Sequence, residues 1–165
     1  MEADIRTRAR LWRKGPVFED FYVGQKFAHH WGRTLTESDT TLFTTLTLSY
    51  NPLYFNRQYA KAHGFSDIVV NPQLLFNIVL GLSVQDLSEM GGPFLGVFDL
   101  SYHRQVHPGI TLRARSETME TRLSESNPDN GIVTWRTEGV DEEGVVVVSF
   151  RRSNLIARRG AVGVD

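Results

Sequence analysis

The polar side chains of residues 49–56, SYNPLYFN, are the most concentrated candidates for chemistry in this sequence. The segment contains no carboxylate and no imidazole; its hydroxyl and amide groups come from Ser49, Asn51, Tyr54 and Asn56. A tyrosine hydroxyl has an ordinary pKa of about 10, so about one part in a thousand is ionised at neutral pH, a handicap of roughly 4 kcal/mol for a base. We therefore expect Tyr54 to donate a proton or orient water, or else to pack and hydrogen-bond at the edge of a sheet.

Two pairs of neighbouring basic residues lie on predicted strands, where adjacent side chains face opposite sides. Of His29 and His30, we expect the inward one to be buried and hydrogen-bonded rather than to act as a base. Of Arg151 and Arg152, one should face the helix side of the sheet or a partner subunit. Such a guanidinium can pair with a structural acid, which we favour, or hold a substrate carboxylate or a phosphate in a forked contact.

The composition argues against several classes of protein. The formal net charge is -1, which provides no global attraction to nucleic acid or to an anionic membrane. The Cys count is 0, so disulfides, thiolate nucleophiles and cysteine-bearing zinc sites are excluded, and no histidine and acid spacing resembles a metal site. No apolar run approaches the ~20 residues of a membrane span, and no secretory signal is evident, so we expect a cytoplasmic protein.

The chain divides into three predicted segments. Residues 1–16 form a basic arm that we interpret as solvated rather than phosphate-binding, residues 17–160 a single domain, and residues 161–165 a tail. At 165 residues and 41% hydrophobic, the chain is long enough to bury one sizeable core.

Helical signals fill the first half of the domain after a strand at residues 26–32. Thr36 and Asp39 predict a capped helix start, and the helix should bury Leu42, Phe43 and Leu46 before Asn51-Pro52 breaks it. A second short helix should end at Gly64. The main helix should begin at Pro72, reach residue 90 and be buried nearly all round, since its apolar positions make a wide face.

The second half changes to alternating polar and apolar residues. It predicts four strands at residues 94–106, 110–124, 131–141 and 144–159, separated by turn-rich segments. A curved antiparallel sheet wrapped around one long helix satisfies this order, which is the α+β hot-dog arrangement, although other helix-on-sheet α+β folds also satisfy it.

Four segments carry a resemblance to a known family. They are RTLTESDTTLFTTLTLSYNPLYFN, AKAHGF, VNPQLLFNIVLGLSVQD and SFRRSNLIARR, in that order along the chain. With them the sequence resembles the MaoC-like hydratases and dehydratases, single hot-dog domains, and is most similar to the mesaconyl-CoA hydratase-like branch. The resemblance implies addition or removal of water at the α,β double bond of an acyl thioester, with coenzyme A or an acyl carrier entering only as part of the substrate and no separate cofactor.

The family's usual motif is altered at each titratable position. It reads Asp-x-Asn-Pro-x-His-x-Asp, followed by a His-Gly pair that opens the buried helix; here the Asp falls on Ser49, the His on Tyr54 and the last Asp on Asn56. The Asn-Pro is kept, and the His-Gly pair falls on Asn71-Pro72, where proline has no amide hydrogen to offer a thioester oxygen.

The resemblance makes Tyr54, Ser49, Asn51 and His103 the catalytic candidates, His103 because hot-dog relatives place their acyl tunnel near that strand end. The substrate-binding candidates are Asn56, Asn71, Gln73 and Arg151.

Three functions stay open at this point. The first is an active lyase on a short, branched or dicarboxylic acyl thioester. The second is a catalytically degenerate partner subunit of a heteromeric MaoC-like hydratase. The third is a hot-dog thioesterase, which is weakened because Gln73 and Asn77 stand where that chemistry needs an acid. By resemblance we expect a homodimer or a heterodimer with a second MaoC-like chain.

Overall fold

The computed structural model describes residues 15–90 and 92–161, so most of the predicted basic arm and of the tail lies outside the described residues. The helices are η1 (Phe18–Asp20), α2 (Glu37–Leu46), η2 (Pro52–Tyr54), α3 (Arg57–Ala62) and α4 (Pro72–Leu87). The strands are β1 (Lys26–Thr34), β2 (Phe94–Tyr102), β3 (Thr111–Leu123), β4 (Asn130–Val140) and β5 (Val146–Ala157). All five predicted strands are present, each within a few residues of its expected bounds.

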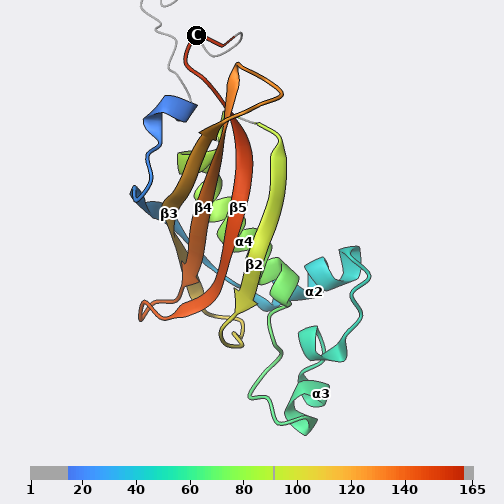
Figure 1. The fold of residues 1–165 in the computed structure, drawn as a ribbon. Coiled ribbons are helices and arrows are strands. Elements are labelled where there is room, and N and C mark those ends of the chain that lie inside the picture. The colour runs from blue at the N-terminus through green and yellow to red at the C-terminus, as the bar shows by residue number, and fades with distance from the viewer. Residues whose placement is uncertain (1–14, 91, 162–165) are drawn as a thin grey trace, which may run out of the picture.

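One antiparallel sheet curves around α4, as the α+β prediction requires (Figure 1). The strand order is β1-β3-β4-β5-β2, so the three consecutive strands of the second half form the centre and β1 and β2 form the two edges. The alternating pattern of the sequence is reproduced in the first half of β3, where every second residue from 112 to 118 is buried. Most positions of β5 are buried on both faces of the sheet. The described helices include none long and apolar enough to cross a membrane.

Helix α4 begins at Pro72 as predicted and ends three residues before the predicted limit. Its buried apolar positions include Leu74, Leu75, Ile78 and Val79, which press against the sheet. The approach is close: a Cβ on Gly139 would lie 2.5 Å from Val79. The prediction of burial nearly all round is wrong for the single chain, because a stripe on the far side of the helix is exposed; it consists of Gln73, Asn77, Gly81, Val84 and Gln85.

Helices α2 and α3 form an excursion that projects from the end of the sheet (Figure 1). The capping box of Thr36 and Asp39 is present, but α2 already ends at Leu46, and Pro52 begins η2 rather than ending α2. The expected burial of Leu42 and Leu46 is wrong, since they are 60% and 73% exposed, while Phe43 packs partly against the core.

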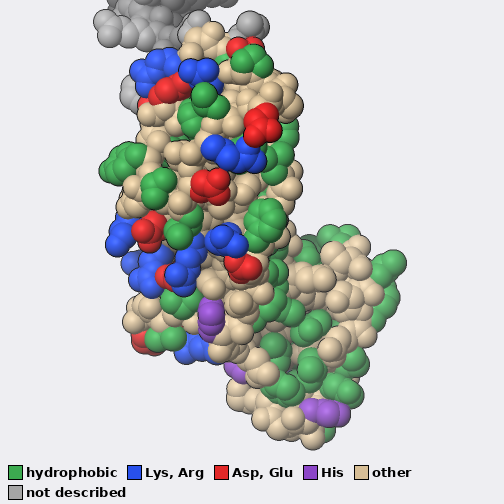
Figure 2. Space-filling view, in the orientation of Figure 1, with side chains coloured by type: hydrophobic (Ala, Val, Ile, Leu, Met, Phe, Trp, Pro, Cys, Tyr) green, Lys and Arg blue, Asp and Glu red, His purple; other side chains and the backbone are tan. Residues whose placement is uncertain are grey.

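The face of α2 that turns inward is polar. Thr40 and Thr44 are fully buried, and their hydroxyls accept hydrogen bonds from the Asn71 backbone and side-chain amides at 3.0 and 3.3 Å. These bonds fix α2 against the start of α4. Because the threonine face of α2 turns inward, the leucines of α2 face the solvent. The space-filling view shows the excursion rich in hydrophobic side chains, whereas charges of both signs are interspersed on the sheet face (Figure 2).

The two ends of α4 meet different cores. Its first half packs into an apolar cluster with Leu112, Val147, Val148 and Phe150 of the sheet. Its second half faces polar groups, of which the buried His29 and Arg152 are the largest, and its last residue, Leu87, joins a smaller apolar cluster with Trp135. The predictions that one residue of each basic pair would face inward are confirmed, because His30 and Arg151 are exposed.

Candidate functional site

An apolar cavity of about 370 Å³ opens where η2, the start of α4 and the end of β2 meet. Its lining is mainly aliphatic and aromatic, with polar groups supplied by a few side chains; the lining residues are Leu53, Tyr54, Phe65, Val69, Val70, Pro72, Leu75, Tyr102, Arg104, Gln105 and Val106. An apolar pocket with few polar groups is typical of a small-molecule site. The cavity therefore contains Tyr54, the predicted proton donor, and Pro72 of the altered His-Gly pair.

The motif segment owes its shape to side chains that cap helices. Asn51 accepts a hydrogen bond from the Leu53 amide at 3.1 Å and starts η2, and Asn56 accepts one from the Tyr59 amide at 3.0 Å and starts α3. Leu48 has a φ of 56°, which lets the chain reverse between α2 and η2. Both asparagines thus orient the backbone that carries Tyr54, and neither lines the cavity in the described structure.

Asn71 has the same capping function at α4. It is 1% exposed, and its side-chain oxygen accepts a hydrogen bond from the Gln73 amide at 2.9 Å. This bond occupies a backbone amide at the helix start, next to Pro72, which has none to offer. The side chain of Gln73 is exposed and does not line the cavity.

Two tyrosine side chains, Tyr54 and Tyr102, line the cavity and can donate hydrogen bonds there. Burial raises the pKa of Tyr102, and the neighbouring Tyr54 raises it further. A hydroxyl whose pKa is raised stays protonated at neutral pH, so it can donate a hydrogen bond to a developing oxyanion. The sequence analysis did not select Tyr102, although its place at the end of a strand next to His103 was a usable signal.

Three other predicted site residues lie apart from the cavity lining. His103 is exposed and hydrogen-bonds through Nε2 to the Ser149 hydroxyl at 2.8 Å. Arg151 lies on the sheet face opposite α4 and pairs with Asp99, Nη2 to Oδ2, at 2.6 Å, which is the structural pairing that we favoured. Ser49 is half-buried in the turn after α2, where its amide donates to the Thr44 carbonyl at 3.0 Å.

Arg104 is a polar lining residue that the sequence analysis missed. Its Nη2 donates to Oδ2 of Asp141, whose side chain is fully buried, and the other oxygen of Asp141 accepts from the Val145 amide at 2.8 Å. No local pattern joins Arg104 to Asp141, because they are 37 residues apart and meet only when β2 pairs with β5.

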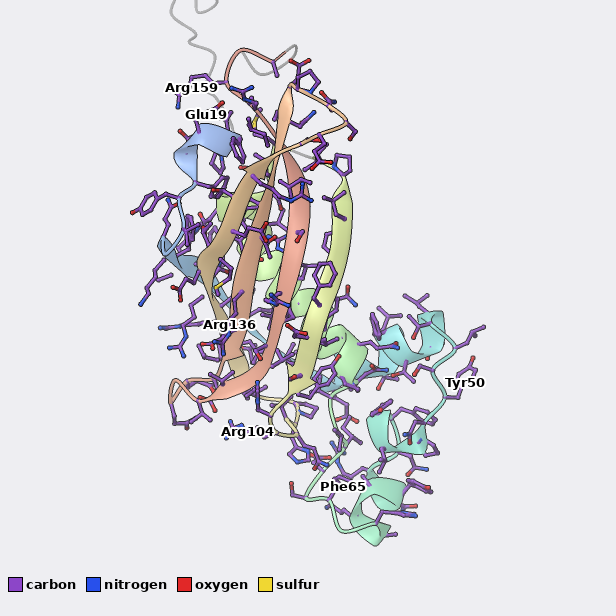
Figure 3. The ribbon with its side chains drawn as sticks, in the orientation of Figure 1. Glu19, Tyr50, Phe65, Arg104, Arg136 and Arg159 are labelled. Atoms are coloured by element: carbon purple, nitrogen blue, oxygen red, sulfur yellow. The ribbon has the colours of Figure 1, made fainter. Side chains whose placement is uncertain are left out.

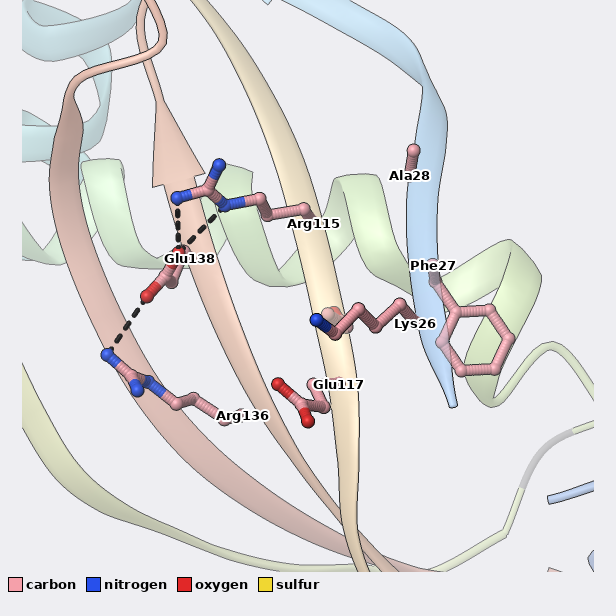
Figure 4. A pocket seen from close by; sticks show the side chains of 8 residues that line it. Lys26, Phe27, Ala28, Arg115, Glu117, Arg136 and Glu138 are labelled. Atoms are coloured by element: carbon pink, nitrogen blue, oxygen red, sulfur yellow. Dashed lines mark hydrogen bonds and ion pairs between the residues drawn. The ribbon is translucent and has the colours of Figure 1, made fainter. Parts of the chain in front are cut away.

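A larger cavity, about 510 Å³, lies at the β1–β3 edge and is lined mainly by charged side chains (Figure 4). Glu138 bridges Arg115 and Arg136 there, at 2.7 and 2.9 Å, so their charges are already partly compensated. We place the candidate site at the smaller cavity, because only that one combines apolar lining with the motif residue Tyr54. The described residues contain no group of three or more His, Cys, Asp or Glu side chains that could hold a metal ion.

The comparison with known proteins identifies the family. The family model described as mesaconyl-CoA hydratase matches residues 2–165. The chain belongs to the mesaconyl-CoA hydratase family. The mesaconyl-CoA hydratase of Haloarcula marismortui is 40% identical over 162 residues, which are 98% of this chain and 45% of that protein. The resemblance to the MaoC-like family is thereby confirmed.

Solved structures confirm the hot-dog fold. A MaoC domain protein dehydratase from Chloroflexus aurantiacus matches with a TM-score of 0.84 and 30% identity, covering 92% of this chain and 43% of that one. A double-hot-dog protein from Mycobacterium tuberculosis matches with a TM-score of 0.81 and 22% identity, over 89% of this chain and 46% of that one. The chain spans about half the length of the curated relatives that it matches.

Proposed function

We propose that the chain is a MaoC-like hydratase or dehydratase, acting at the α,β double bond of a short, branched or dicarboxylic acyl thioester. The observation that carries the proposal is the apolar cavity in which a family motif residue, Tyr54, lies beside Tyr102. The names of its relatives, mesaconyl-CoA hydratase and beta-methylmalyl-CoA dehydratase, support the reaction class. We further propose that the chain uses no cofactor, with coenzyme A or an acyl carrier entering only as part of the substrate, and that its location is cytoplasmic.

The cavity supports a specific assignment of roles. Water addition needs a donor aimed at the thioester oxygen, where charge develops, and a group that moves a proton at the double bond. Tyr102, a phenol that is protonated at neutral pH, suits the first role, and Tyr54 suits the second as a proton donor. Neither is a strong base at neutral pH, so activation of water is the step that this cavity supports least.

A second candidate function follows from that gap. A catalytically degenerate partner, paired with a MaoC-like chain that carries the intact Asp and His, would shape part of an acyl tunnel without supplying the base. The exposed apolar side chains of the excursion favour it, among them Leu46 at 73% and Leu48 at 71%. Exposed apolar surface of this kind marks interaction sites. The homodimer is the alternative assembly.

The deciding experiment measures hydration of mesaconyl-CoA and crotonyl-CoA by the purified chain. For an active lyase we expect Tyr54→Phe to lower kcat by about 10²-fold or more, because one positioned proton donor is lost. Tyr50→Phe is the matched control, since Tyr50 is 63% exposed and lies outside the cavity lining, and it should leave kcat unchanged.

Inactivity on both thioesters would overturn the lyase proposal as stated. The partner proposal then predicts co-purification with a second MaoC-like chain from the native host and activity in the mixture. Recovery of a homodimer alone would contradict the partner proposal. Release of free thiol with no change at the double bond would instead identify a thioesterase.

A further inference from the structure

We propose that Arg104 binds a free carboxylate at the far end of the acyl group and so selects dicarboxylic over monocarboxylic thioesters. The inference rests on the proposed function and assigns its substrate selectivity to one residue. Within the described chain, Arg104 is the only cationic residue that lines the cavity containing Tyr54. The residue that the sequence offered for this role, Arg151, lies on the opposite face of the sheet.

The position of Arg104 suits contact with an acyl chain. The aliphatic side chains of Leu53, Val69 and Leu75 form the apolar wall of the cavity, and Arg104 joins the lining with Tyr102 from the end of β2. Figure 3 shows Arg104 below the end of the sheet, at the same end of the molecule as Phe65, which also lines the cavity. A carboxylate that enters such an apolar space needs a charged hydrogen-bond donor, because losing its water without one is costly.

Asp141 holds Arg104 in place without using the whole guanidinium. The contact engages Nη2, while the other carboxylate oxygen of Asp141 is bound by the Val145 amide, so the aspartate is fixed by the β4–β5 turn. A guanidinium carries five N–H donors in a planar fork. With its side chain 43% exposed, Arg104 keeps donors for a second anion, whereas Asp141 is fully buried. An arginine that is already oriented loses less freedom when it binds a carboxylate.

The expected selectivity follows from the strength of charged hydrogen bonds. A contact between a carboxylate and a guanidinium is worth about 10- to 100-fold in affinity. A substrate that ends in a methyl group cannot form this contact, although it fills the same apolar space. A site that hydrogen-bonds a substrate group discriminates against an analogue that lacks it.

The test compares the binding of two saturated thioesters, succinyl-CoA and butyryl-CoA, by calorimetry. Both carry a four-carbon acyl chain and differ in the terminal carboxylate or methyl group, and neither has a double bond to hydrate, so the measurement does not depend on turnover. We expect the wild-type chain to bind succinyl-CoA about tenfold or more tightly than butyryl-CoA. The double variant Arg104→Gln/Asp141→Asn should lose this preference and keep its affinity for butyryl-CoA.

The double variant is used because Arg104→Gln alone leaves the buried Asp141 charge without its partner and can unfold the chain. The matched control is Arg158→Gln/Glu19→Gln, an Arg–Glu pair whose arginine is 42% exposed and which lies outside the cavity lining. It should bind both thioesters as the wild type does. Arg151→Gln should also keep the preference.

Each other outcome contradicts the proposal in its own way. Equal binding of the two thioesters by the wild type overturns the proposed selectivity. Loss of the preference for succinyl-CoA in Arg151→Gln would show that Arg151, and not Arg104, is responsible for it. If crotonyl-CoA is hydrated in either case, the proposed function stands while this inference fails. Binding of neither thioester overturns this inference, and inactivity on both enoyl thioesters separately overturns the function.

Discussion

The two halves of α4 rest on the same sheet through opposite kinds of contact. The first half buries Leu75, Ile78 and Val79 against Val148 and Phe150, in a cluster made only of apolar side chains. The second half buries Leu87 in a smaller apolar cluster, and it also meets a chain of hydrogen bonds that the first half lacks. Asp86 binds Nδ1 of His29 at 2.6 Å, Nε2 of His29 lies 2.9 Å from the Ser116 hydroxyl, and Ser116 lies 2.8 Å from the Thr137 hydroxyl.

The two kinds of contact contribute differently: apolar packing stabilises the helix against the sheet, and hydrogen bonds fix its orientation. Apolar packing contributes free energy roughly in proportion to buried area and has little directional preference. The polar half is directional: a neutral His29 donates from Nδ1 to Asp86 and accepts at Nε2 from Ser116, which in turn accepts from Thr137. We infer that the apolar half supplies most of the stability and lies beside the candidate cavity, which shares Val70, Leu75 and Val106 with it. The polar half fixes the direction of the helix.

The largest effect is expected from truncation in the apolar half. Phe150 is 1% exposed and packs edge-on against Phe76, with ring centroids 4.9 Å apart. Phe150→Ala should lower the free energy of unfolding by about 3–5 kcal/mol, because it removes a large side chain and leaves a cavity. Urea denaturation measures this loss. Leu123→Ala, at a position that is 55% exposed, should cost less than about 1 kcal/mol; equal losses would contradict the comparison.

A smaller effect, with a pH signature, is expected from the polar half. Burial lowers the pKa of His29, with Arg152 and His30 lowering it further, while Asp86 raises it; the net direction is downward. A folded-state pKa below the unfolded value of about 6.5 means that the unfolded chain binds the proton more readily. Stability is therefore fully present above pH ~6.5 and falls as the pH drops through the folded pKa.

The replacement His29→Gln should remove this pH dependence between about pH 7.5 and pH 5, and cost about 1–3 kcal/mol at neutral pH through lost buried hydrogen bonds. Urea denaturation across this range checks both expectations. The exposed neighbour His30 supplies the control. His30→Gln should show the same dependence of the free energy of unfolding on pH as the wild type. If the free energy of unfolding of His29→Gln changes with pH as that of the wild type does, other groups produce the pH dependence.

The same contrast explains how far the sequence predicts the molecule. The apolar half follows from local periodicity: Pro72 marks the start of α4, and alternation marks β3 to β5, all close to their observed bounds. The inward positions of His29 and Arg152 follow from strand geometry. Local patterns do not report partners that are distant in sequence, such as Asp86 for His29, 57 residues away, or Asp141 for Arg104.

The candidate site shows the same limit. The resemblance directs attention to Tyr54, which does line the cavity, and to Asn51, Asn56 and Asn71, which prove to be helix caps. Residue type alone cannot distinguish an asparagine that binds a ligand from one that caps a helix, since both use the same side-chain oxygen. The excursion misled the prediction for another reason: Leu42 and Leu46 have the spacing of a buried face, but Thr40 and Thr44 are tied to Asn71 and turn them outward.

The smallest effect is expected when Arg152, the most buried charge of the polar half, is replaced by an apolar side chain of similar length. It is 1% exposed, burial lowers its pKa to about 10, and its described hydrogen-bond partners are the neutral Ser83 and Ser88. Its Nε and the Trp135 Nε1 beneath it find no hydrogen-bond partner among the described protein groups, although the guanidinium stacks 5.3 Å from the Trp135 ring.

Burying such a charge costs free energy that a long apolar side chain avoids. Arg152→Met should therefore keep the free energy of unfolding within about 1 kcal/mol of the wild type or raise it. Arg152→Ala, which also removes the volume over Trp135, should lose more than about 2 kcal/mol. Urea denaturation of the two variants separates charge from packing. If Arg152→Met lowers the free energy of unfolding as much as Arg152→Ala does, the hydrogen bonds of the guanidinium stabilise the polar half more than its packing does. The contrast in strength between the two halves of α4 would then be wrong.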